Sequence, residues 1–312
     1  MITKKRVRDA LCAWGMEQEA IHSIVFPSGH VSENTFRVGE DRFIKAYTVP
    51  AKAENNAEIL SALHTAGLSH SVPIPAKSGD LWITSGEFTW LMTGKLPGEP
   101  LSVNALFAPG GEALARYLGE IIGQLHLVLQ KNDSIVCNER NIFEEVRDQW
   151  LMPAKVAMQL PESFCREYLE TFGALQSALP VQIIHRDPNP NNIILQDGKL
   201  TGFIDFELSQ RSIRLFDPCY AATGILVESG AFTGTDLEMR KRWLTLCREI
   251  LRGYDAAVHL TEAEKQSIPY VIFSIQLICV GYFCGEEKFS DLAKVNMQML
   301  RWLMEQRKAL EF

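Results

Sequence analysis

The hydrophobic positions divide the 312-residue chain into two stretches of different character. Up to about residue 93, short runs of β-branched and aromatic residues alternate with Gly, Pro and Asp, as strands alternate with turns. From about residue 109, apolar residues recur every three or four positions, which is typical of helices packed on one face. The pattern predicts a small lobe containing a sheet and a larger, mainly helical lobe.

The first stretch predicts two helices and several strands. A helix over residues 3–14 opens the chain, and a second follows Pro50 and ends at Gly67, a usual helix-stop residue. Strands are expected at residues 21–26, 35–38, 42–47, 72–76, 81–84 and 88–92. The first three of these should form an antiparallel meander.

The second stretch contains one strand-rich interruption between helices. A long amphipathic helix is expected over residues 112–129, followed later by apolar strand-like runs at 181–185 and 193–206. The Asp197-Gly198 pair between two apolar runs is a strong hairpin signal. The fold class is therefore α+β and bilobal, with a boundary in the turn-rich segment TGKLPGEP that separates residues 1–93 from residues 94–312.

The charge and cysteine content exclude several classes of protein. A net charge of -7 leaves no excess of Lys and Arg for a phosphate backbone, so no nucleic-acid partner is expected. The 7 cysteines are scattered without a C-x-x-C pair, and the N-terminus lacks the apolar stretch of a secretory signal. A cytoplasmic location is predicted.

One apolar segment, residues 269–284, raises a membrane span as an alternative. It is short for the roughly 20 residues that cross a bilayer, and it carries Ser274 and Gln276. We expect a buried helix of the helical lobe and no membrane partner.

The candidate chemistry lies in the strand-rich interruption. The run His185-Arg186-Asp187 with Asn192 five residues after the aspartate matches H-R-D-x-x-x-x-N, the catalytic-loop pattern of kinases. Asp205 follows after one hairpin, at the end of an apolar strand. Phosphoryl transfer needs a carboxylate to orient the attacking hydroxyl and oxygen ligands to hold a metal on the phosphates.

The alternative is that these residues form an ordinary Asx-rich turn, since Asp, Asn and Pro dominate loops. Two further residues of the first stretch favour the kinase interpretation. Lys45, in the strand-like run RFIKAY, would reach the nucleotide phosphates, and Glu58 on the next helix would pair with it. Glu54, one turn earlier, is the alternative partner; Glu58 is preferred because Leu60 and Leu63 follow it as a buried face would.

A loop over the phosphates is expected upstream of Lys45. The segment PSGHVSENTFRV places Gly29, Ser32 and Asn34 between two strand candidates, although an ordinary hairpin turn would also fit. Neither a P-loop nor a Rossmann glycine pattern is present, so the usual competing nucleotide sites are not indicated.

In this order the motifs resemble those of the aminoglycoside phosphotransferase and choline kinase superfamily, which shares the protein-kinase-like fold. The resemblance implies an ATP- and Mg²⁺-dependent enzyme with a nucleotide-binding N-terminal lobe. Asp187 would be catalytic, Asn192 and Asp205 would bind Mg²⁺, and Lys45 would bind the ATP phosphates. The backbone of Leu91, Met92 and Thr93 would hold the adenine, and Asp217 would support the catalytic loop.

Two residues depart from the expected patterns, and the second of them puts a protein kinase in doubt. Arg186 stands where many members of the superfamily have Gly or Asn, and Glu207 replaces the glycine of D-F-G. No A-P-E follows, so a small-molecule hydroxyl acceptor is expected rather than a protein substrate.

The acceptor remains open between an aminoglycoside-like compound, a sugar and an amino alcohol. A choline or ethanolamine kinase is a narrower alternative, and a catalytically inactive nucleotide-binding regulatory module is another. Aromatic residues after Asp217 would either line the acceptor pocket or pack in the core: Trp243, Tyr254, Tyr270, Phe273, Tyr282 and Phe283.

Overall fold

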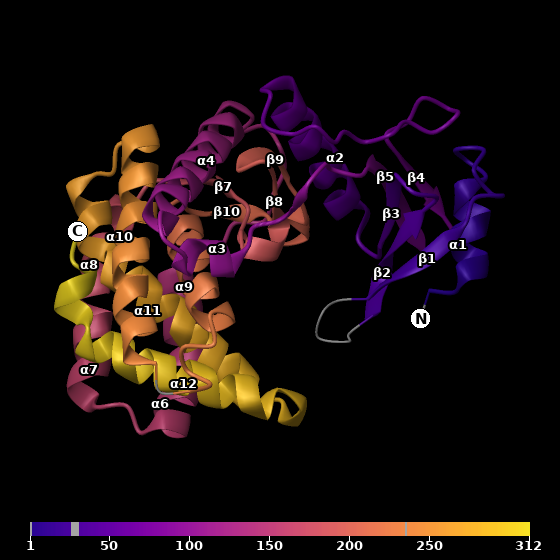
Figure 1. Ribbon diagram of the computed structural model, residues 1–312. Helices are drawn as coiled ribbons and strands as arrows, with labels where there is room; N and C mark the ends of the chain where they lie inside the picture. Colours follow the sequence, from indigo (N-terminus) through magenta and orange to yellow (C-terminus); the bar gives the residue numbers. More distant parts are fainter. Residues whose placement is uncertain (1, 26–30, 235) are drawn as a thin grey trace. The chain divides into compact units, whose positions relative to one another are not determined.

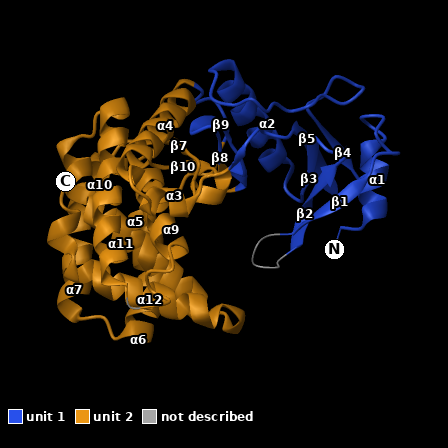
Figure 2. Cartoon of the chain, viewed as in Figure 1, with its two compact units in different colours: residues 1–99, 132–136, 194–207 blue, residues 100–131, 137–193, 208–312 orange. Residues whose placement is uncertain are grey.

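The computed structural model describes residues 2–25, 31–234 and 236–312 (Figure 1). The chain forms two compact units (Figure 2). Unit 1 comprises residues 1–99, 132–136 and 194–207, and unit 2 comprises residues 100–131, 137–193 and 208–312. The predicted domain boundary after residue 93 stays a prediction, because compactness alone does not establish independent domains.

Unit 1 is built on an antiparallel sheet of order β1-β2-β3-β5-β4. Its helices are α1 (Lys4–Leu11) and α2 (Pro50–Thr65). The strands are β1 (Ile21–Val25), β2 (Val31–Val38), β3 (Arg42–Tyr47), β4 (Trp82–Ser85) and β5 (Phe88–Gly94). The predicted meander is confirmed over the described residues, and residue 26 lies outside them.

The core of unit 1 lies between α1 and one face of the sheet. Val7 and Leu11 of α1 are fully buried together with Val38, Ile44 and Met92 of the strands. Apolar residues of the sheet alternate with polar ones because successive side chains of a strand point to opposite faces. Burial of this face holds β3 and β5 at the centre of the sheet.

The strand predicted at residues 72–76 is wrong. Here the structure has a single bridge, between Pro73 and Thr93, and one further hydrogen bond from Ile74 N to Met92 O at 2.8 Å. Pro73 and Pro75 have no backbone N–H to donate to a ladder, so this apolar run cannot continue as a strand.

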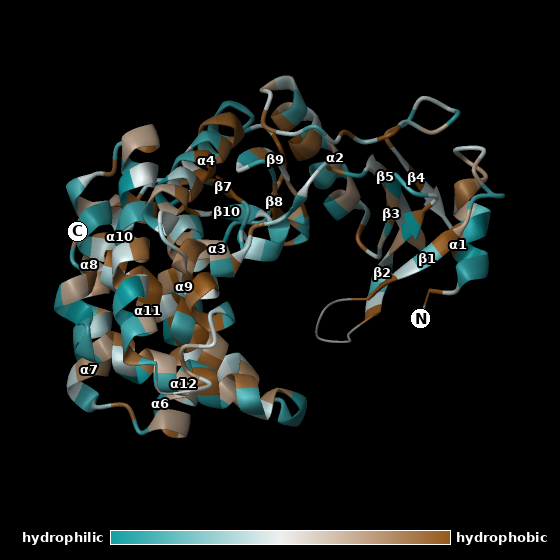
Figure 3. Ribbon diagram, viewed as in Figure 1, coloured by the Kyte–Doolittle hydropathy of each residue, from teal (hydrophilic) through white to brown (hydrophobic). Residues whose placement is uncertain are grey.

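Unit 2 is mainly helical, as predicted. Its helices are α3 (Val103–Phe107), α4 (Gly111–Lys131), α5 (Ile142–Glu145), α6 (Leu151–Met158), α7 (Glu162–Glu167), α8 (Gly173–Leu175), α9 (Phe216–Glu228), α10 (Leu237–Val258), α11 (Glu262–Cys284) and α12 (Ser290–Glu305). Figure 3 shows hydrophobic and hydrophilic residues alternating along these helices, as expected for helices buried on one side.

Short strands interrupt the helices; those at 181–184, 193–196 and 199–203 were predicted, whereas those at 99–100 and 210–213 were not. β7 (Val181–Ile184) pairs with β10 (Gln210–Ile213), and β8 (Ile193–Gln196) pairs with β9 (Lys199–Phe203) next to the two-residue β6 (Glu99–Pro100). Asp197 and Gly198 have φ of 52° and 75°, the left-handed values that a type I′ hairpin turn requires. The predicted hairpin is confirmed.

Helix α11 is long and apolar enough to cross a membrane by length and composition. Within the structure, however, 72% of its most apolar window is buried. Ile268, Val271, Ile272 and Leu277 are fully buried, so the helix forms part of the core of unit 2, as predicted.

Candidate active site

Lys45 of β3 is the centre of a charged cluster in unit 1. Its ammonium lies 2.7 Å from Asp205 Oδ1 and 2.8 Å from Glu207 Oε2. Burial lowers the pKa of Lys45, but the two carboxylates outweigh this effect and the pKa is raised. Lys45 is therefore a fixed positive charge held between two acids.

Asp205 is placed by the end of the apolar strand β9. Phe203 and Phe206 on either side are buried, whereas the Asp205 side chain is 46% exposed. Its φ of 65° is in the left-handed region, which Asp tolerates better than most residues. The backbone bend turns the carboxylate toward Lys45.

Asp205 and Glu207 both contact the Lys45 ammonium, so their carboxylates lie close enough together to be considered as ligands of a metal ion. Both carboxylates already share a single cation, and oxygen donors are what Mg²⁺ prefers. Among the described residues no group of three His, Cys, Asp or Glu forms a metal cluster.

The predicted Lys45–Glu58 ion pair is wrong for this structure. Glu58 is exposed, and the ion pairs of Lys45 among the described residues are those with Asp205 and Glu207. On α2, Ile59 and Leu63 are fully buried while Glu58 faces away from them. The presence of apolar residues just after Glu58 was a poor guide, because neighbouring positions on a helix are 100° apart.

The residues expected in a loop over the phosphates are only partly described. Gly29 lies outside the described residues. Ser32 and Asn34 belong to strand β2 and not to a loop. The Ser32 hydroxyl accepts a hydrogen bond from Thr35 N at 3.1 Å, and Thr35 Oγ1 donates to Asn34 Oδ1 at 3.2 Å.

The backbone expected to hold adenine is occupied by the sheet. Leu91 and Met92 are buried in β5, opposite Lys45 and Ile44 of β3. Met92 O also accepts the hydrogen bond from Ile74 N. The Met92 carbonyl is therefore already engaged, whereas Thr93, near the end of β5, is less buried. The contact of this backbone with adenine stays a prediction.

The catalytic-loop motif forms a compact polar turn in unit 2. Asn189 Nδ2 donates to Asp187 Oδ1 at 2.9 Å, and Asn192 Nδ2 donates to Asp187 Oδ2 at 3.1 Å and to Asp187 O at 2.9 Å. Pro190 opens a 3₁₀ turn, Pro190–Asn192, that fixes the spacing. The amide oxygen of Asn192 is the atom suited to a metal.

Asp217 of α9 fixes the backbone of this loop, as predicted. Its two carboxylate oxygens accept hydrogen bonds from His185 N at 2.8 Å and Arg186 N at 2.9 Å. The carboxylate is fully buried and also lies 2.9 Å from His126 Nε2. A buried charge is stabilised when all of its acceptor sites are satisfied in this way.

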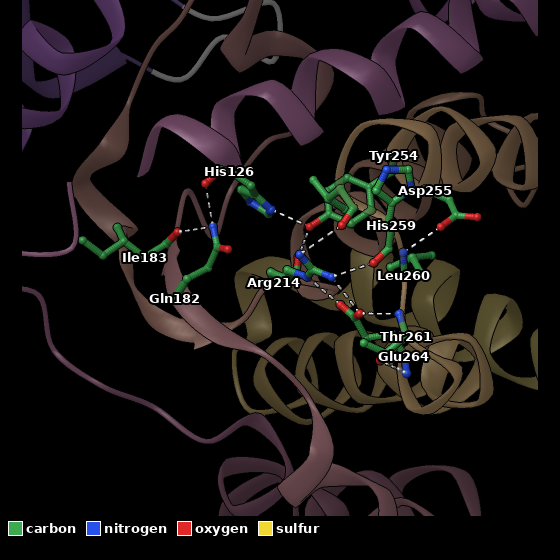
Figure 4. Close-up of polar contacts among 11 residues, drawn as sticks. His126, Gln182, Ile183, Arg214, Tyr254, Asp255, His259, Leu260, Thr261 and Glu264 are labelled. Atoms are coloured by element: carbon green, nitrogen blue, oxygen red, sulfur yellow. Dashed lines mark hydrogen bonds and ion pairs between the residues drawn. The ribbon is translucent and has the colours of Figure 1, made fainter. Parts of the chain in front are cut away.

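A polar network extends from His126 to the start of α11 (Figure 4). His126 Nδ1 lies 2.6 Å from the Tyr254 hydroxyl, which donates to Arg214 O at 3.4 Å. The Arg214 guanidinium binds both oxygens of the fully buried Glu264 at 2.8 and 2.9 Å. The network couples the catalytic loop to three helices of unit 2.

Two residues beside Asp187 were not predicted. Tyr220 of α9 lies beside Asp187, and burial together with the Asp187 charge raises the pKa of Tyr220. Glu228, two turns further along α9, accepts a hydrogen bond from Asn191 Nδ2 at 3.0 Å. Their spacing of 8 residues places both on one face of the helix. This spacing could not identify them from the sequence, because the sequence does not show that α9 packs on the loop.

The predicted aromatic residues divide into two groups. Trp243, Tyr254, Tyr270 and Phe273 are buried, which supports a core role, whereas the exposed fraction of Tyr282 is 48%.

Together, a sheet unit with a Lys–Asp pair and a helical unit with an H-R-D loop define the protein-kinase-like class of fold. The model of the phosphotransferase enzyme family (APH) matches residues 23–254. The chain belongs to this family.

Solved structures support the fold. The microcompartment-associated aminopropanol kinase aligns with a TM-score of 0.71 and 16% identity over 99% of both chains. An aminoglycoside phosphotransferase from Alicyclobacillus acidocaldarius aligns with a TM-score of 0.63 and 16% identity over 100% of this chain and 97% of that one. The predicted bilobal kinase-like fold is confirmed.

Sequence relatives include two homoserine kinases. The enzyme of Azorhizobium caulinodans is 28% identical over 57% of this chain and 55% of its own length. That of Xanthobacter autotrophicus is 27% identical over 68% of this chain and 62% of its own. The chain thus spans about half the length of the curated relatives it matches.

Proposed function

We propose that the protein is an ATP- and Mg²⁺-dependent phosphotransferase that moves the γ-phosphate to a hydroxyl of a small molecule. The observation that carries this proposal is the Asp187 carboxylate, oriented by Asn189 and Asn192 on a loop that Asp217 holds. A carboxylate fixed in this way can accept the hydroxyl proton as the oxygen attacks phosphorus.

The proposed roles of the other residues follow from their chemistry. Lys45 would neutralise nucleotide phosphates, and Asp205 and Asn192 would supply oxygen ligands to Mg²⁺, a cation that stabilises negative charge on a transferred phosphoryl group. When a nucleotide binds, phosphate oxygens would replace Asp205 and Glu207 as the partners of Lys45. Asp187, Asn192, Asp205 and Lys45 are all present, which argues against an inactive regulatory module.

Among the possible acceptors, an amino alcohol is favoured over an aminoglycoside or a sugar. The relatives described above carry the name homoserine kinase, and one structural neighbour is an aminopropanol kinase. Both names describe short amine-bearing alcohols. Choline and ethanolamine belong to the same chemical class and stay in the test panel.

We further propose a cytoplasmic enzyme without a membrane, nucleic-acid or protein-substrate partner. The seven cysteines are free thiols in the structure, which suits a reducing compartment. The net charge of -7 disfavours polyanions.

The test is ATP consumption by purified protein with Mg²⁺ across homoserine, aminopropanol, ethanolamine, choline, aminoglycosides and sugars. Acceptor-dependent turnover that is lost in Asp187→Ala supports the proposal. ATP binding without turnover of any acceptor would favour the regulatory module instead.

A further inference from the structure

Arg186 is an unusual residue for its backbone conformation. Its φ of 74° lies in the left-handed region, which glycine adopts readily and a long side chain does not. The conformation is imposed by the loop, because it allows the consecutive amides of His185 and Arg186 to bind one carboxylate, that of Asp217. Strain of this kind is concentrated at functional sites.

The Arg186 side chain is enclosed but weakly hydrogen-bonded. The guanidinium stacks on the Phe216 ring at 3.9 Å, and the side chain is only 14% exposed. A guanidinium has five N–H donors, yet among the described residues its side chain makes one hydrogen bond, from Nη2 to Glu145 Oε2 at 3.4 Å. A single hydrogen bond of this length offsets little of the free-energy cost of removing both charges from water.

Glu145 is also only weakly engaged. Its side chain is 10% exposed, and its second oxygen accepts a hydrogen bond from Trp150 Nε1, again at 3.4 Å. Glu145 ends α5 and precedes a π-helical turn, Val146–Trp150, a feature found often at functional sites. Arg186 and Glu145 thus present opposite charges, both with unused hydrogen-bonding capacity.

This charged pair is connected to the proposed reaction centre. Arg186 directly precedes Asp187 in the catalytic loop. The Phe216 ring beneath the guanidinium stacks on Tyr220 at 5.5 Å, and Tyr220 lies close enough to Asp187 to feel its charge. Arg186 and Glu145 are therefore a pair of opposite charges that adjoins the loop carrying Asp187.

We propose that Arg186 is a specificity-determining residue that binds the carboxylate of a hydroxy amino acid, with Glu145 receiving its ammonium group. The inference rests on the proposed function and narrows its acceptor to a zwitterion. The planar guanidinium fork matches a carboxylate in a bidentate manner, and a zwitterion adds no net charge to the pocket. Both members of the pair would gain short, charge-assisted hydrogen bonds in addition to the 3.4 Å contacts that they make within the part of the chain that the structure describes.

The experiment compares acceptors that differ only in the carboxylate. Homoserine and 3-aminopropan-1-ol form one pair, and serine and ethanolamine form another. The wild-type protein should prefer the carboxylate-bearing member. Arg186→Gly, which suits the backbone, and Arg186→Met should lower kcat/KM for that member about 10- to 100-fold, as expected for loss of a charged hydrogen bond.

The same variants should lower kcat/KM for the amine without a carboxylate less than for its carboxylate-bearing counterpart, and the remaining turnover of the amine shows that they fold. Arg186→Lys should recover part of the loss, since it restores the charge without the fork. Arg147→Met is the matched control, because Arg147 is an exposed arginine on the neighbouring turn that pairs with Asp148. It should change neither acceptor.

Equal losses for both members of a pair in Arg186→Gly would overturn the inference and leave the proposed function standing. If the wild-type protein phosphorylated only the amines without a carboxylate, the inference about Arg186 would likewise be overturned and the proposed function would stand. Absence of turnover with every acceptor, including aminoglycosides and sugars, would overturn both.

Discussion

At the scale of single residues, the site is defined by carboxylates whose partners differ. Asp187 is held by neutral amides from Asn189 and Asn192, whereas Asp205 is bound to the Lys45 ammonium. A carboxylate whose hydrogen-bond donors are neutral amides can use its negative charge to accept a proton. A carboxylate paired with a side-chain cation can exchange that cation for a metal ion. The sequence pattern predicted a role for each acid but did not reveal these partners.

Removal of the Asp187 carboxylate should abolish most of the catalysis. Asp187→Ala is expected to lower kcat by about 10²- to 10⁴-fold, the usual contribution of a positioned acid or base, with nucleotide affinity largely kept. Steady-state kinetics with a saturating acceptor measure it. Asp197→Asn, in the exposed hairpin turn, is the matched control; an unchanged kcat in Asp187→Ala would refute the proposed role.

The Lys45 cluster predicts a pH dependence of stability. The pKa of Lys45 is raised above 10.5, so the stabilisation from its two ion pairs is complete below pH 10.5 and is lost as the pH rises through the folded-state value. The difference in free energy of unfolding between wild type and Lys45→Met should therefore be constant from about pH 7 to pH 10 and shrink above that. Urea titrations measure it; a difference that already declines below pH 9 would contradict this account.

At the scale of elements, α4 and α10 determine how the loop-bearing part of unit 2 packs. A Cβ added to Gly119 of α4 would lie 1.9 Å from Ile250 O, and one added to Gly253 of α10 would lie 1.9 Å from Arg116 O. Glycine therefore permits the two backbones to approach closely. His126 on α4 and Tyr254 on α10 meet because of this approach.

Alanine at this crossing should destabilise the protein. Gly253→Ala is expected to lower the free energy of unfolding by about 1–3 kcal/mol, the range for overpacked cores, since backbone atoms must shift. Gly234→Ala is the control, because nothing lies within 4 Å of an added Cβ there. If Gly253→Ala and Gly234→Ala had equal midpoints of chemical denaturation, α4 and α10 could move apart without lowering the free energy of unfolding, and this account would be contradicted.

Most elements were predictable, and the errors have identifiable causes. The strands 42–47 and 88–92 and the helix 112–129 follow from strong local periodicity. The false strand at 72–76 arose because apolar content was weighed above the missing donors of Pro73 and Pro75. The predicted Lys45–Glu58 pair was wrong because Glu58 was chosen from the apolar residues that follow it and not from the direction of its own side chain.

The network behind the catalytic loop was beyond sequence reasoning. His126 contacts Tyr254 across 128 positions and Asp217 across 91, so no local pattern relates them. Arg186 was noticed only as a departure from related motifs. Its partner Glu145, 41 positions earlier, required the packing of unit 2 to identify.

At the scale of the whole molecule, nucleotide binding should depend on Mg²⁺ through Asp205. A nucleotide at 100 times its Kd stabilises a folded protein by about 2.7 kcal/mol. Asp205→Ala should lose the Mg²⁺-dependent part of the increase in Tm produced by ATP, while Asp197→Asn keeps it. An unchanged Mg²⁺-dependent increase in Asp205→Ala would remove Asp205 from the metal site.

Formation of the product tests the proposed phosphoryl transfer to a small acceptor most directly. The protein would be incubated with ATP, Mg²⁺ and homoserine or 3-aminopropan-1-ol, beside Asp187→Asn, and the acceptor analysed by mass spectrometry. The account predicts a phosphorylated acceptor and an equal amount of ADP with wild type, and neither with the variant. ADP formation without a phosphorylated acceptor, or equal product from Asp187→Asn, would contradict it.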